Sequence, residues 1–131
     1  MAQLFSLGSM NSSRIHFEFS PSDGDLAEII ASATPPEGIT VTKPGHVIKA
    51  SAETGGVFVH IAIEFAVQVS ATIVAAWIYD CWKKHTKKKS ARINRQQASL
   101  TKRTILRLIK QELAEQKARE EQYKRDHDNA A

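Results

Sequence analysis

The sequence predicts a small α+β domain, with helices on one face of a short sheet in the order β-α-β-α-β-α. Three observations favour this class. Residues 14–20, RIHFEFS, alternate between polar and apolar side chains, as a strand with one buried face does. Residues 57–82 form a long apolar run, and residues 101–126 place apolar side chains at helical spacing. The composition, 42% hydrophobic and 24% charged over 131 residues, is that of one globular domain.

The first fifty residues alternate strand and helix signals. Ile15, Phe17 and Phe19 share the face of the first strand that we expect to be buried. Acidic residues near the start of the following helix complement the positive end of its dipole, and Pro35-Pro36 ends it. The elements expected are a strand over 14–20, a turn over 21–24, a helix over 25–33, a strand over 39–43 and an edge strand over 46–50.

The apolar run over 57–82 is interpreted as a long central helix that continues through the lysines to about residue 90. His60, Glu64 and Gln68 recur every four residues, so on a helix they form one narrow polar stripe. Such a helix suits a core position in which the polar edge reaches water. The alternative is a single membrane span, because roughly 18 apolar residues with few charges can cross a bilayer. The lysines that follow would then lie on the cytoplasmic side.

Two observations favour the buried helix over the span. A glutamate inside a bilayer costs roughly 2–3 kcal/mol and needs a partner, and the chain has no second apolar span to supply one. The fragment left outside, about 50 residues with no disulfide, would be too small to be stable alone. We therefore expect a cytoplasmic protein, with a membrane location as the alternative.

The last third predicts a short strand or hairpin and a long helix. Residues 91–100, ARINRQQASL, are expected to turn near Asn94-Arg95. Thr101 can cap the final helix, which should dock by its first three turns and then project into water. The apolar residues of those turns are Ile105, Leu108, Ile109 and Leu113. The expected organisation is a disordered or cloning-derived leader over 1–12, one α+β domain over 13–113 with the central helix at about 57–90, and an exposed helical extension and tail over 114–131.

Charge is divided unevenly along the chain. Residues 1–82 carry three basic and eight acidic side chains, whereas residues 83–131 carry fifteen basic and six acidic ones. The segment from residue 83 to residue 110 has no acid at all. Such a segment is either a solvated face balanced by the acidic half of the chain or a surface that binds a partner, and we predict that it binds a partner. Its members are Lys83, Lys84, Lys87, Lys88, Lys89, Arg92, Arg95, Lys102, Arg103, Arg107 and Lys110.

Three kinds of partner fit such a segment. An acidic protein surface, or a second copy of the chain, could dock there. A nucleic acid could bind through its phosphates, although the segment has no interleaved aromatic side chain for stacking. Anionic membrane headgroups are the third candidate. We favour the protein partner, and Arg119 with Tyr123 on the C-terminal extension could form an additional arm for it.

No motif in the chain indicates catalysis. His60 and Glu64 at four-residue spacing would be half of a carboxylate-bridged metal site, but no matching pair accompanies them. Cys81 is the single cysteine, so there is neither a disulfide framework nor a zinc pattern. Glycine patterns for nucleotides and the GxSxG motif are also missing. We predict a protein without enzymatic activity, cofactor or metal.

Residues 55–113 resemble the small constant components that accompany variable effectors in bacterial conflict systems. The resemblance rests on Gly55-Gly56, on the alanine-rich helix ending AAWIYDCWKK with its lysine cluster, and on RINRQQASL before an amphipathic helix. In that family, an apolar helix ending in Trp-Leu and basic residues precedes a strand and a final helix. This chain departs from it by lacking a glycine near Asn94-Arg95 and by carrying Glu64. The resemblance implies a non-catalytic adaptor in a bacterial or phage conflict system, and it assigns no site residues.

Overall fold

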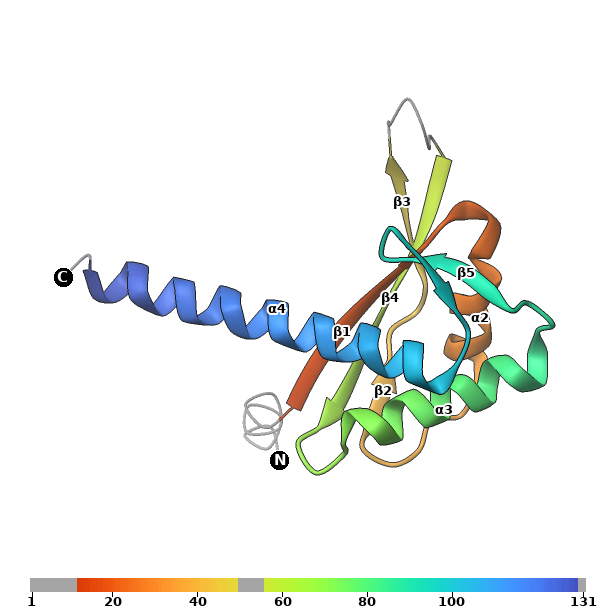
Figure 1. Ribbon diagram of the computed structural model, residues 1–131, viewed down its shortest axis with the longest axis horizontal. Helices are drawn as coiled ribbons and strands as arrows, with labels where there is room; N and C mark the ends of the chain where they lie inside the picture. The colour runs from red at the N-terminus through yellow and green to blue at the C-terminus, as the bar shows by residue number, and fades with distance from the viewer. Residues whose placement is uncertain (1–11, 50–55, 130–131) are drawn as a thin grey trace.

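The computed structural model describes residues 12–49 and 56–129 and confirms a small α+β domain (Figure 1). Three helices, a short 3-10 turn and a six-stranded sheet make up these residues. The elements are β1 (Ser12–Phe19), η1 (Pro21–Asp23), α2 (Asp25–Ser32), β2 (Ile39–Val41), β3 (Gly45–Lys49), β4 (Gly56–Ala66), α3 (Ala71–His85), β5 (Ser90–Ile93), β6 (Gln96–Ser99) and α4 (Lys102–Asn129).

The sheet is antiparallel and is built around β4. Its strand order is β2-β4-β1-β5-β6, and β3 also pairs with β4. One side of β4 pairs with the whole of β1, from Ser12↔Ala66 to Phe19↔Val59. Its other side pairs with β3 along the first half and with β2 along the second. β4 is therefore the strand that organises the sheet.

The prediction of one central helix over 57–90 is wrong. The first part of that run is β4, residues 67–69 form a turn, and α3 begins after Ser70, whose hydroxyl caps it by accepting from Ile73 N. A spacing of four residues is also two periods of a strand, so His60 and Glu64 share one face of β4 without being helical. The helix ends at His85 rather than near residue 90. Of the helices that the structure describes, none is both long and apolar enough to cross a membrane.

The three helices cover one face of the sheet, as expected. The buried residues of β1, among them Ile15, Phe17 and Phe19, pack with those of β4, α2, α3 and α4 in a single hydrophobic cluster. Trp82 lies in that cluster, edge-on to Phe19, with ring centroids 6.1 Å apart. Its indole Nε1 donates to the Leu26 carbonyl at 3.0 Å, so α3 is held to α2 by both packing and a hydrogen bond.

The hairpin and the last helix follow the prediction. Asn94 and Arg95 form the turn between β5 and β6, with φ values of 52° and 67°. The Thr101 hydroxyl accepts from Thr104 N at 3.2 Å and so caps α4. Ile105, Leu108 and Ile109 are buried, and Leu113 is partly buried. Beyond these turns α4 projects from the domain (Figure 1), and its residues from 114 to 127 are mostly exposed. The predicted leader over 1–12 lies outside the described residues except for Ser12.

Candidate functional site

A groove rich in lysine lies where α3 ends and α4 begins. It has a volume of about 380 Å³ and contains no carboxylate among its lining residues. We call it the lysine groove. Its lining residues are Tyr79, Trp82, Lys83, Thr86, Lys87, Lys88, Lys89, Leu100 and Thr101. The groove therefore combines an apolar floor with a cationic rim.

The end of α3 sets the shape of the groove. Thr86 leaves the helix with extended backbone, φ −142° and ψ 152°, while its N–H still donates to the Trp82 carbonyl at 2.9 Å. The Thr86 hydroxyl then accepts from Lys88 N at 3.2 Å and tightens the loop. Lys89 O accepts from Leu100 N at 2.8 Å, which holds the loop against the end of β6. Consecutive lysines are thereby fixed on a short, constrained segment.

Tyr79 is the aromatic centre of the groove. Lys83 Nζ lies 5.8 Å from the centroid of the Tyr79 ring, and Lys102 Nζ lies 5.5 Å from it. Contacts of this kind contribute about 0.5–1 kcal/mol each at exposed sites. Tyr79 thus gathers a lysine from α3 and a lysine from the first turn of α4, which are 19 positions apart in the sequence.

Lys88 differs from the other lysines of the groove because the domain itself holds it. Its Nζ donates to Asp25 Oδ1 at 2.8 Å, to the Ser22 carbonyl at 2.9 Å and to Asp23 Oδ1 at 3.1 Å. The hydrogen bond to Asp25 is the main reason that the pKa of Lys88 is raised, and the bond to Asp23 adds to it. Lys88 therefore anchors the loop to η1 and α2, while Lys87 and Lys89 on either side are exposed.

The structure brings together some of the predicted basic residues and leaves others apart. Lys83, Lys87, Lys88 and Lys89 line the groove, and Lys102 joins them through Tyr79. None of the remaining six is among the lining residues of the groove. These are Lys84 at the end of α3, Arg92 and Arg95 on the hairpin, and Arg103, Arg107 and Lys110 along α4, all of them exposed.

The two residues proposed for an arm lie on the projecting part of α4. Tyr123 is 63% exposed and packs on His127 one turn later, with ring centroids 3.8 Å apart. Arg119 lies nearer the sheet, where it lines a shallow pocket with Arg14 and His16 of β1. The two side chains therefore do not form one cluster with the lysine groove.

A second polar region lies on β1 and β4, and the sequence interpretation missed it. His16 Nδ1 and His60 Nε2 are 2.9 Å apart, with the two rings stacked at a centroid distance of 5.1 Å. Burial, followed by the charges of His60, Arg14 and Arg119, lowers the pKa of His16. The alternation of residues 57–66 was the signal that could have placed His60 on a strand.

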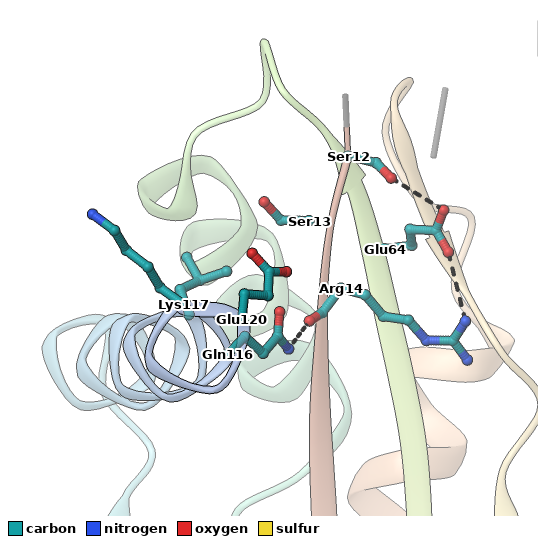
Figure 2. A pocket seen from close by; sticks show the side chains of 8 residues that line it. Ser12, Ser13, Arg14, Glu64, Gln116, Lys117 and Glu120 are labelled. Atoms are coloured by element: carbon teal, nitrogen blue, oxygen red, sulfur yellow. Dashed lines mark hydrogen bonds and ion pairs between the residues drawn. The ribbon is translucent and has the colours of Figure 1, made fainter. Parts of the chain in front are cut away.

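Beside that region, β1 and α4 enclose a larger pocket of about 700 Å³ (Figure 2). On the β4 side, Glu64 accepts from the Ser12 hydroxyl at 3.4 Å and lies 3.9 Å from the Arg14 guanidinium. On the α4 side, the Gln116 amide donates to the Arg14 carbonyl, and Lys117 and Glu120 complete the wall (Figure 2).

Neither region contains a set of groups suited to a metal or to nucleophilic chemistry. Within residues 12–49 and 56–129, no three His, Cys, Asp or Glu side chains are placed to hold a metal ion. Cys81 is buried, and burial raises the pKa of its thiol despite the nearby Lys84. A buried thiol with a raised pKa is a poor nucleophile.

Comparison of the chain with known protein families, with curated proteins and with solved structures gave no match. The resemblance of residues 55–113 to the constant components of conflict systems therefore stays a prediction.

Proposed function

We propose that this protein is a non-enzymatic interaction module that binds an acidic segment of a partner protein in the lysine groove. One observation carries the proposal: Lys83 and Lys102 lie over the Tyr79 ring, and Lys83, Lys87 and Lys89 line the adjoining groove, which no carboxylate lines. A carboxylate entering the groove would make charge-assisted hydrogen bonds, which are roughly twice as strong as neutral ones. The exposed part of Tyr79 would contact an apolar side chain of the same segment.

The distribution of charge favours an acidic protein over a nucleic acid. A phosphate backbone is bound by basic groups that follow it over a long distance. Here Arg92 and Arg95 lie on the hairpin, and Arg103 and Arg107 lie along α4, outside the short groove. The groove also offers Tyr79 and the buried Trp82 rather than a row of exposed aromatic side chains for stacking.

The role that we infer is that of a constant adaptor in a bacterial or phage conflict system, acting in the cytoplasm. Its support is the resemblance of residues 55–113, a range that includes every lining residue of the groove. The single cysteine, which is buried, fits a reducing compartment. An adaptor needs no catalytic group, and its specificity comes from the segment that it binds.

The proposal is tested with a fluorescent peptide that has four glutamates around a central leucine, measured by anisotropy. The triple variant Lys83→Glu, Lys87→Glu, Lys102→Glu should lose at least about tenfold in affinity, because three attractive contacts become repulsive. The matched control is Arg95→Glu, Arg107→Glu, Lys110→Glu, which changes the net charge equally outside the groove. It should retain affinity within about threefold, because exposed charges far from a site are largely screened.

Two other probes decide between the partner classes. A DNA duplex and vesicles containing phosphatidylserine are titrated at about 50 and 200 mM salt, where binding through phosphates weakens steeply. Equal loss of peptide binding in both triple variants would overturn the proposal, because net charge alone would then explain it. Binding of the duplex or the vesicles, together with no binding of the peptide, would overturn it as well.

A further inference from the structure

The strand β3 forms an outer edge of the sheet. It pairs with β4 along all five of its residues, from Gly45↔His60 to Lys49↔Gly56. Among the described strands, none lies on the other side of β3. In Figure 1, β3 and the start of β4 extend beyond the other strands. A strand edge of this kind presents backbone N–H and C=O groups with which another chain can pair. We call the side of residues 45–49 that faces away from β4 the β3 edge.

The pairing of β4 determines which backbone groups of β3 face outward. Ala62 of β4 bonds toward β2, because its carbonyl accepts from Thr42 N at 3.0 Å. Along an antiparallel strand, the backbone groups of successive residues face opposite sides. Positions 60, 58 and 56 of β4 therefore bond toward β3, and their partners at 45, 47 and 49 face inward. His46 and Ile48 consequently present their N–H and C=O groups to the β3 edge.

These outward groups differ from the other unpaired backbone of the sheet. Where β5 does not pair with β1, the side-chain amide of Asn94 bonds both Glu18 N and the His16 carbonyl. Within residues 12–49 and 56–129, no hydrogen bond of this kind reaches the outward groups at positions 46 and 48. A strand that arrives at the β3 edge therefore displaces no hydrogen bond of the described fold.

The β3 edge is short because the chain is irregular before it. The registers of β2 and β3 on β4 differ by one residue, so the segment between them contains a β-bulge. Pro44 lies in this segment and has no N–H to donate. Among the described residues on this side of β4, an added strand can therefore pair continuously only with residues 45–49.

A second copy of β3 can use this whole edge in a single register. In an antiparallel pair, a residue with outward backbone groups must lie opposite another such residue. When residue 47 lies on the two-fold axis, His46 of each copy lies opposite Ile48 of the other, and every residue of the strand is paired. A register shifted by one residue places outward groups opposite inward ones, and a larger shift leaves the ends of the strand unpaired.

The residue types of β3 fit this register. Lys49 lies opposite Gly45 of the second copy, and His46 lies opposite Ile48, so no like charges are directly opposite, where they would be destabilising. The lysine groove and the two pockets beside α4 contain no residue of β3. A foreign strand gains its specificity from side-chain pockets. A second copy needs none of them, because two-fold symmetry repeats each contact.

We propose that two copies of this protein associate through β3, as an antiparallel strand pair about a two-fold axis at residue 47, and so join their sheets into one. Interfaces as small as this edge belong to weak, transient complexes, so the association should depend on concentration. No residue of β3 lines the lysine groove. The inference therefore stands independently of the function proposed for that groove.

The first test is disulfide cross-linking of the full chain. All variants carry Cys81→Ala, so the introduced thiol is the only one. Val47→Cys should form a linked dimer at least about tenfold faster than His46→Cys, because residue 47 lies directly opposite its own copy, within reach of a disulfide. Val67→Cys, at a position that is 72% exposed, measures random collision. Each rate is normalised by the reaction of the same thiol with a small disulfide. Equal normalised rates for Val47→Cys and Val67→Cys would overturn the proposal.

The second test compares NMR spectra of the ¹⁵N-labelled wild type at about 0.05 and 1 mM, a range suited to a weak dimer. The amide protons of His46 and Ile48 should shift downfield at the higher concentration, because they gain hydrogen bonds. The amide proton of residue 47, which faces β4, should move less. Unchanged amides at positions 46 and 48 would contradict the proposal. The alternative occupant is probed with a capped Glu-Val-Glu-Val-Glu peptide. Shifts of these amides with the peptide alone would assign the edge to a foreign strand and reject the second copy.

Two further variants locate the contact. Ile48→Pro removes an outward N–H from an edge position, where proline is tolerated. Combined with Val47→Cys, it should reduce cross-linking to the rate of Val67→Cys while the spectrum stays dispersed. If this variant unfolds, the comparison of positions 46, 47 and 67 decides the outcome. The lysine-groove triple variant, combined with Val47→Cys, should still cross-link rapidly. Loss of the dimer in that variant would place the contact in the lysine groove and refute the role of β3.

Discussion

Lys88 Nζ lies 3.1 Å from Asp23 Oδ1, so a lysine of the basic segment is bonded to the acidic first part of the chain. The other oxygen of Asp23 accepts from the Ser20 hydroxyl at 2.9 Å and from Arg92 N at 3.0 Å. The carboxylate thus ties η1 both to the loop after α3 and to β5. The opposite charges of the two parts of the sequence are partly matched inside the fold, and Lys88 is one of the residues that match them.

Removal of the Asp23 carboxylate should destabilise the domain. Asp23→Ala removes the acceptor of three hydrogen bonds, and we expect the free energy of unfolding in urea to fall by about 2 kcal/mol. Asp25→Ala is the control. The Asp25 carboxylate is half exposed, and its ion pair is with one residue, Lys88, which Asp23 and the Ser22 carbonyl also hold. This control substitution should cost no more than about 1 kcal/mol. An Asp23→Ala variant as stable as the wild type would contradict the role given to this carboxylate.

Asp23 should also make the free energy of unfolding depend on pH in the acidic range. Burial alone would raise the pKa of Asp23, but the hydrogen bonds from Arg92 N, Lys88 and Ser20 lower it below its usual value. The folded state therefore binds a proton less readily than the unfolded state. The stabilisation by Asp23 is fully present above the unfolded pKa of about 3.9 and is lost as the pH falls through the lower folded value. In Asp23→Ala, the loss of stability between about pH 5 and pH 2 should be shallower.

His16 should add a second dependence on pH, nearer to neutrality. Burial and the charges of His60, Arg14 and Arg119 lower the pKa of His16. With two protonated rings, the 2.9 Å contact between His16 and His60 would also lose its acceptor. The contribution of His16 is present above the unfolded pKa of about 6.5 and is lost as the pH falls through the lower folded value. The urea midpoint should therefore fall as the pH drops below about 6.5.

Two variants check the assignment to His16. His16→Gln should flatten the dependence of the urea midpoint between about pH 7 and pH 5. His85→Gln, at an exposed position at the end of α3, should leave the dependence unchanged. The same slope in the wild type and in His16→Gln would refute the assignment.

The turn between β5 and β6 should tolerate a stabilising substitution. Arg95 has a φ of 67°, a conformation that costs a residue with Cβ about 1 kcal/mol and costs glycine little. Asn-Gly is also the preferred pair for a two-residue turn with two positive φ values. Arg95→Gly should therefore raise the melting temperature by a few degrees. Gln97→Gly, in the adjoining strand β6, should lower it, because glycine weakens a strand.

Where a pattern is local, the sequence was sufficient to predict the structure. The alternation RIHFEFS predicted β1 and its buried residues Ile15, Phe17 and Phe19, and the turn at Asn94-Arg95 was correctly placed. The docking of α4 by Ile105, Leu108 and Ile109 followed from helical spacing. In each case the pattern repeats within a few residues, so neighbouring positions carry the information.

The apolar run at 57–82 shows where local pattern was insufficient. A helix satisfies its backbone within itself, whereas β4 takes its hydrogen-bonding partners from β1, β2 and β3, which lie elsewhere in the chain. The recurrence of His60 and Glu64 at a spacing of four fits both structures. Pairing with three strands decided between them, and no single stretch of sequence contains that information.

The candidate sites divide in the same way. Composition by itself determined that residues 83–110 are basic and that the chain carries one cysteine. Only the tertiary structure decided which lysines converge, because Tyr79 gathers Lys83 and Lys102 from two helices while Asp23 and Asp25 hold Lys88. It also decided the contact between His16 and His60, which the strand register produces across 44 positions. Charge is a property of each residue and is visible in the sequence, but a site depends on distances between residues that only folding makes short.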